Sequence, residues 1–274
     1  MKDLKQYPKK IIDFYYFSGT GNTLLIVKEI AAFFRKNKFK VTIFPIEKTD
    51  PQTINKDHII GLGFPVAAQG TYPFIWQFIN DLPPASFTPL FLVDTLMLYS
   101  GGILGPIKKI VEKKRYIPLG AKEFIMPSNV FVKENNNNRK WIIIKRALKK
   151  AENFANKLLH GRATWIDLPL YSDLMAMISK SVGNWKFFES LTPIGVDRSK
   201  CTSCGLCEKL CPTHNITLAE FPEFLHHCVL CMRCFSYCPE NAIYFKHYRS
   251  AQYRAVEVDE LLHHSSEHNN KYKD

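Results

Sequence analysis

The segments CTSCGLCEKLCP at residues 201–212 and CVLCMRCFSYCP at residues 228–239 decide how this chain is interpreted. Each holds four cysteines with gaps of two, two and three residues, and a proline follows the fourth. The two segments are offset by 27 residues at every cysteine and at the proline. Short gaps of this kind let consecutive thiolates converge on one centre, so the pattern predicts cluster ligands.

The alternatives to cluster ligands are a pair of zinc sites and a set of disulfides. Zinc sites usually show C-x2-C pairs separated by a longer stretch. A secreted disulfide protein would spread its cysteines through its core, whereas the first 200 residues here contain none. The apolar run 11–17 is short and is interrupted by Asp13, which argues against a signal peptide. We therefore expect the protein to be located in the reducing cytoplasm.

The composition is that of an ordinary globular protein. Of the 274 residues, 46% are hydrophobic and 23% are charged. No stretch approaches the ~18 consecutive apolar residues of a membrane helix, so we expect no membrane span.

Strand and helix patterns alternate through the first half of the sequence. Short apolar runs predict strands over 11–17, 40–46, 58–64, 89–94 and 122–126. Helical spacing predicts helices over 24–37, 73–82, 103–115 and 138–160. This alternation predicts a parallel sheet covered on both faces.

The loop between the first strand and the first helix is Ser18-Gly19-Thr20-Gly21-Asn22-Thr23. It combines small residues and hydrogen-bonding side chains with a helix N-terminus, where backbone N–H groups and the helix dipole attract anions. The sequence of this loop matches neither the G-x-G-x-x-G motif nor a Walker loop, and a glycine-containing turn of this kind can also be purely structural. It predicts a phosphate site of moderate specificity.

The segment 196–248 resembles the bacterial two-cluster ferredoxins throughout. In that family three close thiolates hold one cubane and the fourth ligand comes from the other repeat. The resemblance implies one [4Fe–4S] cluster on Cys201, Cys204, Cys207 and Cys238. It implies a second on Cys228, Cys231, Cys234 and Cys211. Gly205 is expected to let the backbone approach the sulfurs, and His214, His226 and His227 are expected to be ordinary surface residues.

The first half resembles the flavodoxins in its loop 18–23 and in the loops after its third and fourth strands. Flavodoxin-like sheets have strand order 2-1-3-4-5 and bind FMN beyond the carboxyl ends of the strands. The resemblance implies FMN contacts at Ser18, Gly19, Thr20, Gly21, Asn22, Thr23, Pro65, Val66, Ala67, Thr95, Tyr99, Gly101 and Gly102. Flavodoxins commonly sandwich the flavin between aromatic residues. Here Tyr99 is the candidate for one side, while Phe64 and Tyr72 bound the other loop and Phe64 is expected in the core.

The whole chain resembles a family of flavodoxin–ferredoxin fusions. We expect an α/β doubly wound domain over 1–160, a helical connector over 161–195, and a small α+β ferredoxin-like domain over 196–248. Residues 249–274 are expected to form a polar, disordered tail. The connector should dock the second domain in a fixed pose, because it is rich in large apolar residues rather than glycine and serine.

The expected function is electron transfer between the clusters and FMN. The alternative is a flavin-dependent reductase of a small organic substrate that the clusters supply with electrons. Residues 1–160 carry 25 Lys+Arg against 12 Asp+Glu, whereas 161–274 carry 12 against 13. This asymmetry predicts an acidic redox partner of the ferredoxin or flavodoxin type. Nucleic acid is not expected as a partner, because no known binding motif accompanies the basic helices.

Overall fold

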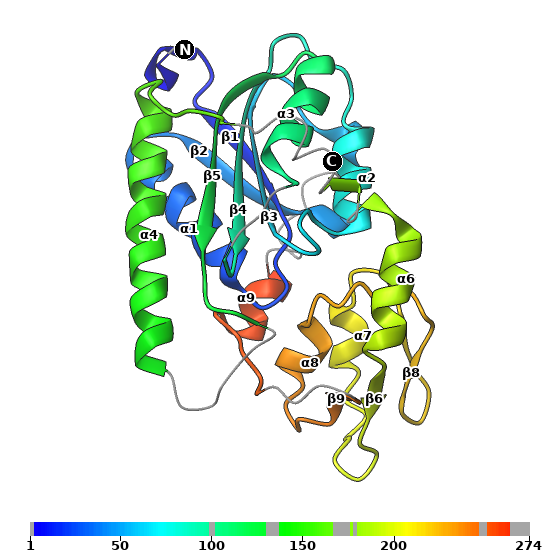
Figure 1. Ribbon diagram of the computed structural model, residues 1–274. Helices are drawn as coiled ribbons and strands as arrows, with labels where there is room; N and C mark the ends of the chain where they lie inside the picture. Colours follow the sequence, from blue (N-terminus) through cyan, green and yellow to red (C-terminus); the bar gives the residue numbers. More distant parts are fainter. Residues whose placement is uncertain are drawn as a thin grey trace, which may run out of the picture.

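The computed structural model describes residues 3–98, 102–129, 137–166, 176–177, 180–246 and 251–263. A five-stranded parallel sheet has the order β2-β1-β3-β4-β5, which is the flavodoxin-like doubly wound order expected from the sequence. Its strands are β1 (Ile11–Tyr16), β2 (Lys40–Pro45), β3 (Ile59–Pro65), β4 (Pro89–Leu96) and β5 (Ile117–Ile125). Figure 1 shows their carboxyl ends pointing toward the C-terminal half of the chain.

The pattern of burial follows from the position of each strand. Every residue of β4 is buried, as expected for a strand with neighbours on both sides and helices on both faces. Strand β5 begins at Ile117, five residues before the predicted start at Lys122. Its second residue is Pro118, which is tolerated because β5 is an edge strand and the missing N–H takes no bond from the ladder.

Helices cover both faces of the sheet, as predicted (Figure 1). They are α1 (Asn22–Lys36), α2 (Pro73–Asp81), α3 (Leu104–Lys113) and α4 (Asn137–Leu159). Helices α1 and α4 share one apolar core, and α2 and α3 share the other. The helical spacing of Leu24, Val27, Ala31 and Phe34 is confirmed, because all four side chains are fully buried. The short 3-10 turns are η1 (Leu4–Gln6), η2 (Ile46–Lys48) and η3 (Pro51–Thr53).

The C-terminal half lies beyond the carboxyl ends of the sheet (Figure 1). Its elements are α6 (Val182–Leu191), β6 (Ile194–Val196), α7 (Leu206–Leu210), β7 (Ile216–Leu218), β8 (Pro222–Phe224), α8 (Arg233–Tyr237), β9 (Ile243–Phe245) and α9 (Val258–His263). Strand β6 pairs with β9 and β7 with β8, both antiparallel. This is the small α+β unit expected for 196–248. No helix among the described residues is long and apolar enough to cross a membrane.

The expectation of a disordered tail is wrong for residues 251–263. Tyr253, Val256 and Leu261 are buried, and Val256 and Leu261 belong to the same apolar core as α1. Lys28 of α1 forms an ion pair with Glu260 of α9. Spaced apolar residues within a polar sequence therefore fold back onto the first half, which the average composition of the segment did not indicate.

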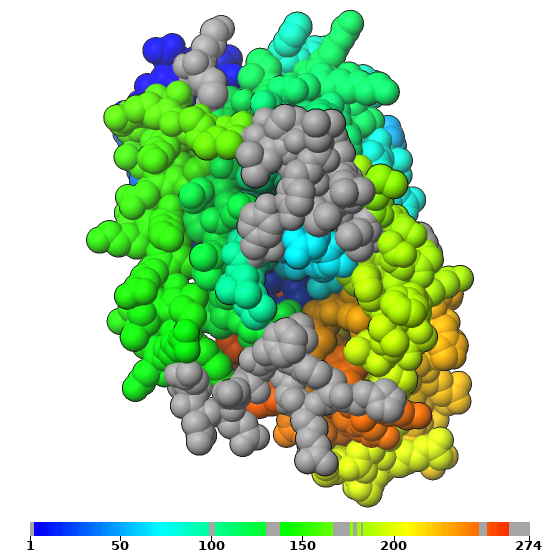
Figure 2. Space-filling model, viewed as in Figure 1, coloured from blue at the N-terminus to red at the C-terminus, as the bar shows by residue number. Residues whose placement is uncertain are grey.

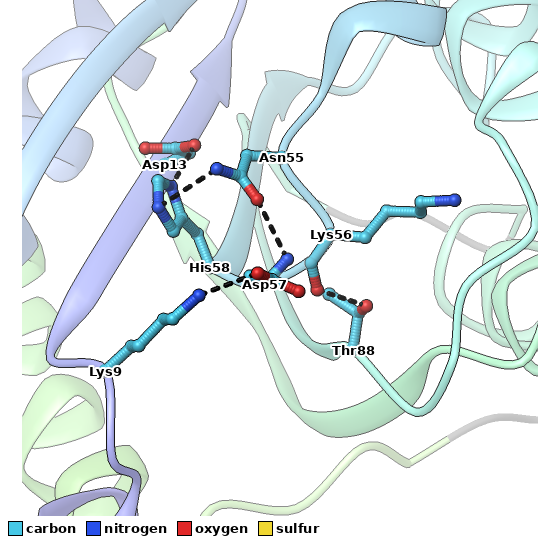
Figure 3. Close-up of polar contacts among 7 residues, drawn as sticks. All are labelled: Lys9, Asp13, Asn55, Lys56, Asp57, His58 and Thr88. Carbon is cyan, nitrogen blue, oxygen red and sulfur yellow. Dashed lines mark hydrogen bonds and ion pairs between the residues drawn. The ribbon is translucent and has the colours of Figure 1, made fainter.

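The amino-terminal edge of the sheet carries a cluster of polar contacts (Figure 3). Asp13 of β1 lies 2.8 Å from Nδ1 of His58, and Nε2 of His58 lies 3.2 Å from the Asn55 amide nitrogen. Nearby, Lys9 pairs with Asp57 at 2.6 Å. These contacts tie β1 to the turn that leads into β3, at the edge opposite the carboxyl ends where loop 18–23 lies.

Candidate functional site

A cavity of about 410 Å³ lies at the carboxyl ends of the parallel strands. The loops after β1, β3, β4 and β5 form its walls together with α6 and Leu230. Figure 2 shows a hollow on this face, with dark-blue atoms of the N-terminal residues deep between cyan and orange segments. Of the residues that the sequence analysis proposed, it brings together Ser18, Gly19, Thr20, Asn22, Thr23, Pro65, Val66, Ala67 and Thr95.

Most polar side chains of the loop 18–23 hold the loop in shape. The Ser18 hydroxyl accepts hydrogen bonds from the backbone N–H of Gly21 at 3.1 Å and of Leu24 at 3.3 Å. The Thr23 hydroxyl bonds that of Thr95 at 2.8 Å. The Asn22 amide donates to the Pro127 carbonyl at 2.9 Å and accepts from the Tyr253 hydroxyl at 2.6 Å. These hydrogen bonds fix the shape of the loop, while the Ser18 hydroxyl, which accepts both of its bonds, still has its own proton to donate.

The Thr20 hydroxyl is different, because it makes no hydrogen bond within the described part of the chain although Thr20 is only 2% exposed. Thr20 lines the cavity beside the first turn of α1. Amides in the first turn of a helix have no partner within the helix. The combination of this hydroxyl with amides at the start of α1 suits a bound anion.

Both glycines of the loop are required by contacts with the C-terminal half. A Cβ on Gly19 would lie closer than 3.0 Å to the Cys231 carbonyl oxygen. Gly21 has φ +96°, and a Cβ there would also lie 2.6 Å from a Val256 methyl. The sequence analysis attributed these glycines to an anion site. The structure adds a second reason, since the loop packs directly on a cysteine segment and on residues 251–263.

The other predicted FMN-binding residues have mixed outcomes. Gly102 is buried but does not line the cavity, and its N–H donates to the Gln69 carbonyl at 2.8 Å, which joins two loops. Tyr99 and Gly101 lie outside the described residues. Phe64 is fully buried, so its expected place in the core is confirmed.

Besides Leu230, two parts of the cavity wall were missed. Residues 126–129, directly after β5, line it, and so do Trp185 and Phe188 of α6. The first could have been found, because every loop at the carboxyl edge of a parallel sheet is a candidate for the site. The second had no local signal, since the apolar residues of the connector indicated docking only. Trp185 lies against Tyr72, with ring centroids 5.4 Å apart.

The eight cysteines are free thiols that line two small cavities. The first cavity is bordered by Cys201, Cys204, Cys207 and Cys238. The second is bordered by Cys211, Cys228, Cys231 and Cys234. The chain thus groups its thiols crosswise between the two segments, in the same sets that the ferredoxin resemblance implies. Within the described residues, no three His, Cys, Asp or Glu side chains are arranged around a single metal ion.

The 27-residue repeat of the sequence recurs in the backbone. Gly205 and Met232 both have positive φ, at 72° and 68°. So do Ser203 and Leu230, both at 52°. A Cβ at Gly205 would make only an ordinary contact at 3.5 Å, with a Leu218 methyl. Gly205 lines the first thiol cavity and adopts its positive φ without strain, and its expected role in the approach to the sulfurs stays a prediction. His214, His226 and His227 are exposed, as expected.

Most of the thiols are partly buried from solvent, and backbone N–H groups donate hydrogen bonds to three of the sulfur atoms. Burial raises the pKa of Cys207 to about 11 and the pKa of Cys231 to about 11. Backbone N–H groups of Asn215, Leu230 and Ala242 donate to the sulfurs of Cys211, Cys228 and Cys238 at 3.2–3.3 Å. Such bonds stabilise negative charge on sulfur and are one of the levers on cluster potential.

The second cavity adjoins the large cavity, and Leu230 lines both. The first cavity includes Cys204, which is the exposed cysteine of the eight. The two thiol sets therefore differ in surroundings, one facing solvent and the other facing the loop 18–23.

Arg233, between Met232 and Cys234, connects the second thiol set to the first half of the chain. Its guanidinium pairs with Glu47 at 2.6 Å, and both side chains are 7% exposed. Its Nε donates to the Ser18 carbonyl at 2.8 Å, and the guanidinium lies 4.4 Å from the Phe17 ring centroid. Burial acts to lower the pKa of Arg233, but the neighbouring Glu47 carboxylate and Cys231 outweigh it and the pKa is raised. The charged side chain of Arg233 therefore holds the two halves together through its contacts with Glu47 and Ser18.

Residues 197–243 match the family model described as a 4Fe-4S dicluster domain. No curated protein matches the chain. Among solved structures, the chain is similar to a flavodoxin from the domain Archaea, with 10% identity, TM-score 0.41, and coverage of 55% of this chain and 99% of that chain. It is similar to the Streptococcus pneumonia TIGR4 flavodoxin, with 14% identity, TM-score 0.43, and coverage of 54% and 97%. The Megasphaera elsdenii flavodoxin has 23% identity, TM-score 0.36, and coverage of 51% and 98%. The strand order of the first half is flavodoxin-like and residues 197–243 match a 4Fe-4S dicluster domain, and the two together fit the architecture of a flavodoxin–ferredoxin fusion.

Proposed function

We propose that this protein passes electrons between two [4Fe–4S] clusters and an FMN bound in the large cavity. The observation that carries the proposal is the shared wall, because Leu230 lines both that cavity and the second thiol cavity. FMN exchanges one or two electrons and a cluster exchanges one, so the combination links one-electron to two-electron chemistry.

The two thiol sets are the proposed cluster ligands. Cys201, Cys204, Cys207 and Cys238 would hold the distal cluster, and Cys211, Cys228, Cys231 and Cys234 the proximal one. The crosswise grouping supports this assignment, because each set draws three thiols from one segment and one from the other. The match of residues 197–243 to a dicluster domain supports it independently.

The loop 18–23 is the proposed phosphate site. Thr20 supplies a hydroxyl, and the start of α1 supplies amides and the positive end of the helix dipole. Pro65, Val66, Ala67 and Thr95 line the remainder of the cavity, where the ring would lie. The absence of a lysine from this loop is no obstacle, since oriented amides bind anions without a fixed charge.

The difference in exposure supports an order for the electron path. The distal set contains the exposed Cys204, so a partner protein would exchange electrons there. The proximal set adjoins the FMN cavity. We expect the partner to be acidic, because the basic excess of residues 1–160 would attract a negative surface to the molecule as a whole, while residues 161–274, which hold the distal set, are close to neutral. The eight free thiols favour the reducing cytoplasm as the location of this protein.

The experiment is anaerobic purification followed by analysis of iron, sulfide and flavin. About eight irons, eight sulfides and one FMN per chain would support the whole proposal. Zinc without sulfide would refute the cluster assignment, and iron and sulfide without any affinity for FMN would refute the flavin assignment.

A further inference from the structure

We propose that helix α6, outside the flavodoxin-like half, supplies an aromatic wall for the flavin ring through Trp185 and Phe188. The inference rests on the proposed FMN site and names residues of that site. The site for the flavin ring would then depend on both halves of the chain, because the aromatic wall comes from the segment that joins them.

Among its described residues, the flavodoxin-like half contributes one aromatic side chain, that of Tyr72, to this cavity. Among the described residues of the loops after β3 and β4, the lining side chains are those of Pro65, Val66, Ala67, Ala68, Thr95, Leu96 and Met97. Tyr72 also lines it, and its ring packs edge-on against Phe17 and in parallel with Phe74. At 4% exposed, Tyr72 is about as buried as Trp185, which is 5% exposed. Apart from Tyr72, the described part of these loops presents no aromatic side chain to the cavity, where a planar ring would gain from one.

Helix α6 supplies that surface. Trp185 and Phe188 both line the cavity, and their rings meet edge to face with centroids 5.8 Å apart. They lie three residues apart, on one side of the helix. Phe187, next to Phe188, is 58% exposed and does not line the cavity. The helix therefore directs one of two adjacent phenylalanines into the cavity and leaves the other outside it.

Contacts at both ends fix α6 in this position. Before the helix, the Lys180 ammonium lies 4.6 Å from the ring centroid of Trp76 in α2. Near its end, the Glu189 carboxylate accepts a hydrogen bond from the backbone N–H of Cys228 at 3.3 Å. Figure 1 shows α6 between α2 and the C-terminal unit. The same helix thus touches the proposed proximal cluster segment and the proposed ring site, so the wall is preorganised.

The test measures binding of FMN and of riboflavin, which has the same ring without the phosphate, to flavin-free protein that retains its iron. Phe188→Leu should weaken both ligands by the same factor, about tenfold or less for one lost aromatic contact. Trp185→Leu should act in the same direction. Thr20→Asp should weaken FMN far more than riboflavin, because the added carboxylate repels the phosphate.

Two variants serve as matched controls. Phe187→Leu removes the exposed neighbour on the same helix, and Trp141→Leu removes a tryptophan that is 56% exposed on α4. Both should bind FMN and riboflavin like the unaltered chain. The fluorescence of bound flavin gives a second readout, since close aromatic side chains quench it. The bound flavin should become brighter in Phe188→Leu and stay quenched in Phe187→Leu.

The outcomes separate this inference from the proposed function. If the unaltered protein binds neither ligand, the flavin assignment itself is refuted and the wall with it. If it binds both, and Phe188→Leu retains the same affinities and the same quenching, only the aromatic wall is refuted. If Phe188→Leu weakens FMN but not riboflavin, the side chain acts on the phosphate end and the assignment to the ring is wrong.

Discussion

The Arg233–Glu47 pair offers the sharpest test of how the two halves are joined. Both side chains are 7% exposed, so neither charge can be solvated if its partner is removed. Breaking a buried pair by removing one member typically costs about 3–5 kcal/mol. Arg233→Met should fall in this range, because it leaves the Glu47 carboxylate buried and also removes the hydrogen bond to the Ser18 carbonyl.

The double variant Arg233→Met/Glu47→Leu should recover most of the loss. Apolar residues of similar volume often replace a buried pair at little cost, and one Glu47 oxygen has no hydrogen-bond partner in the described residues even in the intact pair. We expect the double variant to lie within about 2 kcal/mol of the unaltered protein. Anaerobic urea unfolding of the unaltered protein, of the single variants Arg233→Met and Glu47→Leu, and of the double variant gives the coupling energy. Losses that simply add in the double variant would refute the argument.

Two further predictions concern single residues. Gly19→Ala should destabilise the protein by about 1–3 kcal/mol in thermal melts, because the added Cβ would collide with the Cys231 carbonyl. The control Gly183→Ala, where a Cβ meets only the Ser181 hydroxyl at 3.6 Å, should be neutral or stabilising. Equal effects of the two variants would argue against the close approach at Gly19. Asp94 is fully buried without a hydrogen bond in the described chain, and burial, helped by Glu123, raises its pKa well above the usual value. The unaltered protein should therefore lose stability as pH rises from the ordinary carboxyl pKa toward that raised pKa, by up to about 1.4 kcal/mol for each pH unit. In urea unfolding from pH 5 to 8, the free energy of unfolding of Asp94→Asn should rise relative to that of the unaltered protein as pH rises. A difference between the two proteins that does not change with pH would contradict this.

The sequence was sufficient for the fold because its patterns are local. Periodicity placed Leu24, Val27, Ala31 and Phe34 on the buried face of α1. The alternation of strands and helices predicted the parallel sheet, and the flavodoxin resemblance predicted its order. The thiol sets followed from the resemblance to ferredoxins, and the structure groups the cysteines in the same way.

The sequence did not reveal the contacts between distant segments. Arg233 and Ser18 are 215 residues apart, and Tyr253 and Asn22 are 231 apart. A charged residue inside a cysteine segment is usually solvated, and only the packing of the two halves buries this one. The same holds for Trp185, whose place in the cavity wall depends on how α6 docks. Pairing of this kind leaves no periodic trace in a single sequence.

Intramolecular electron transfer between the proximal cluster and FMN is the central claim, and rapid-mixing kinetics test it most directly. The clusters are reduced under anoxic conditions, and the appearance of reduced flavin is followed at several protein concentrations. Since Leu230 borders both cavities, the rate should be independent of protein concentration. A rate proportional to protein concentration would mean that electrons pass between molecules, and the account would be wrong.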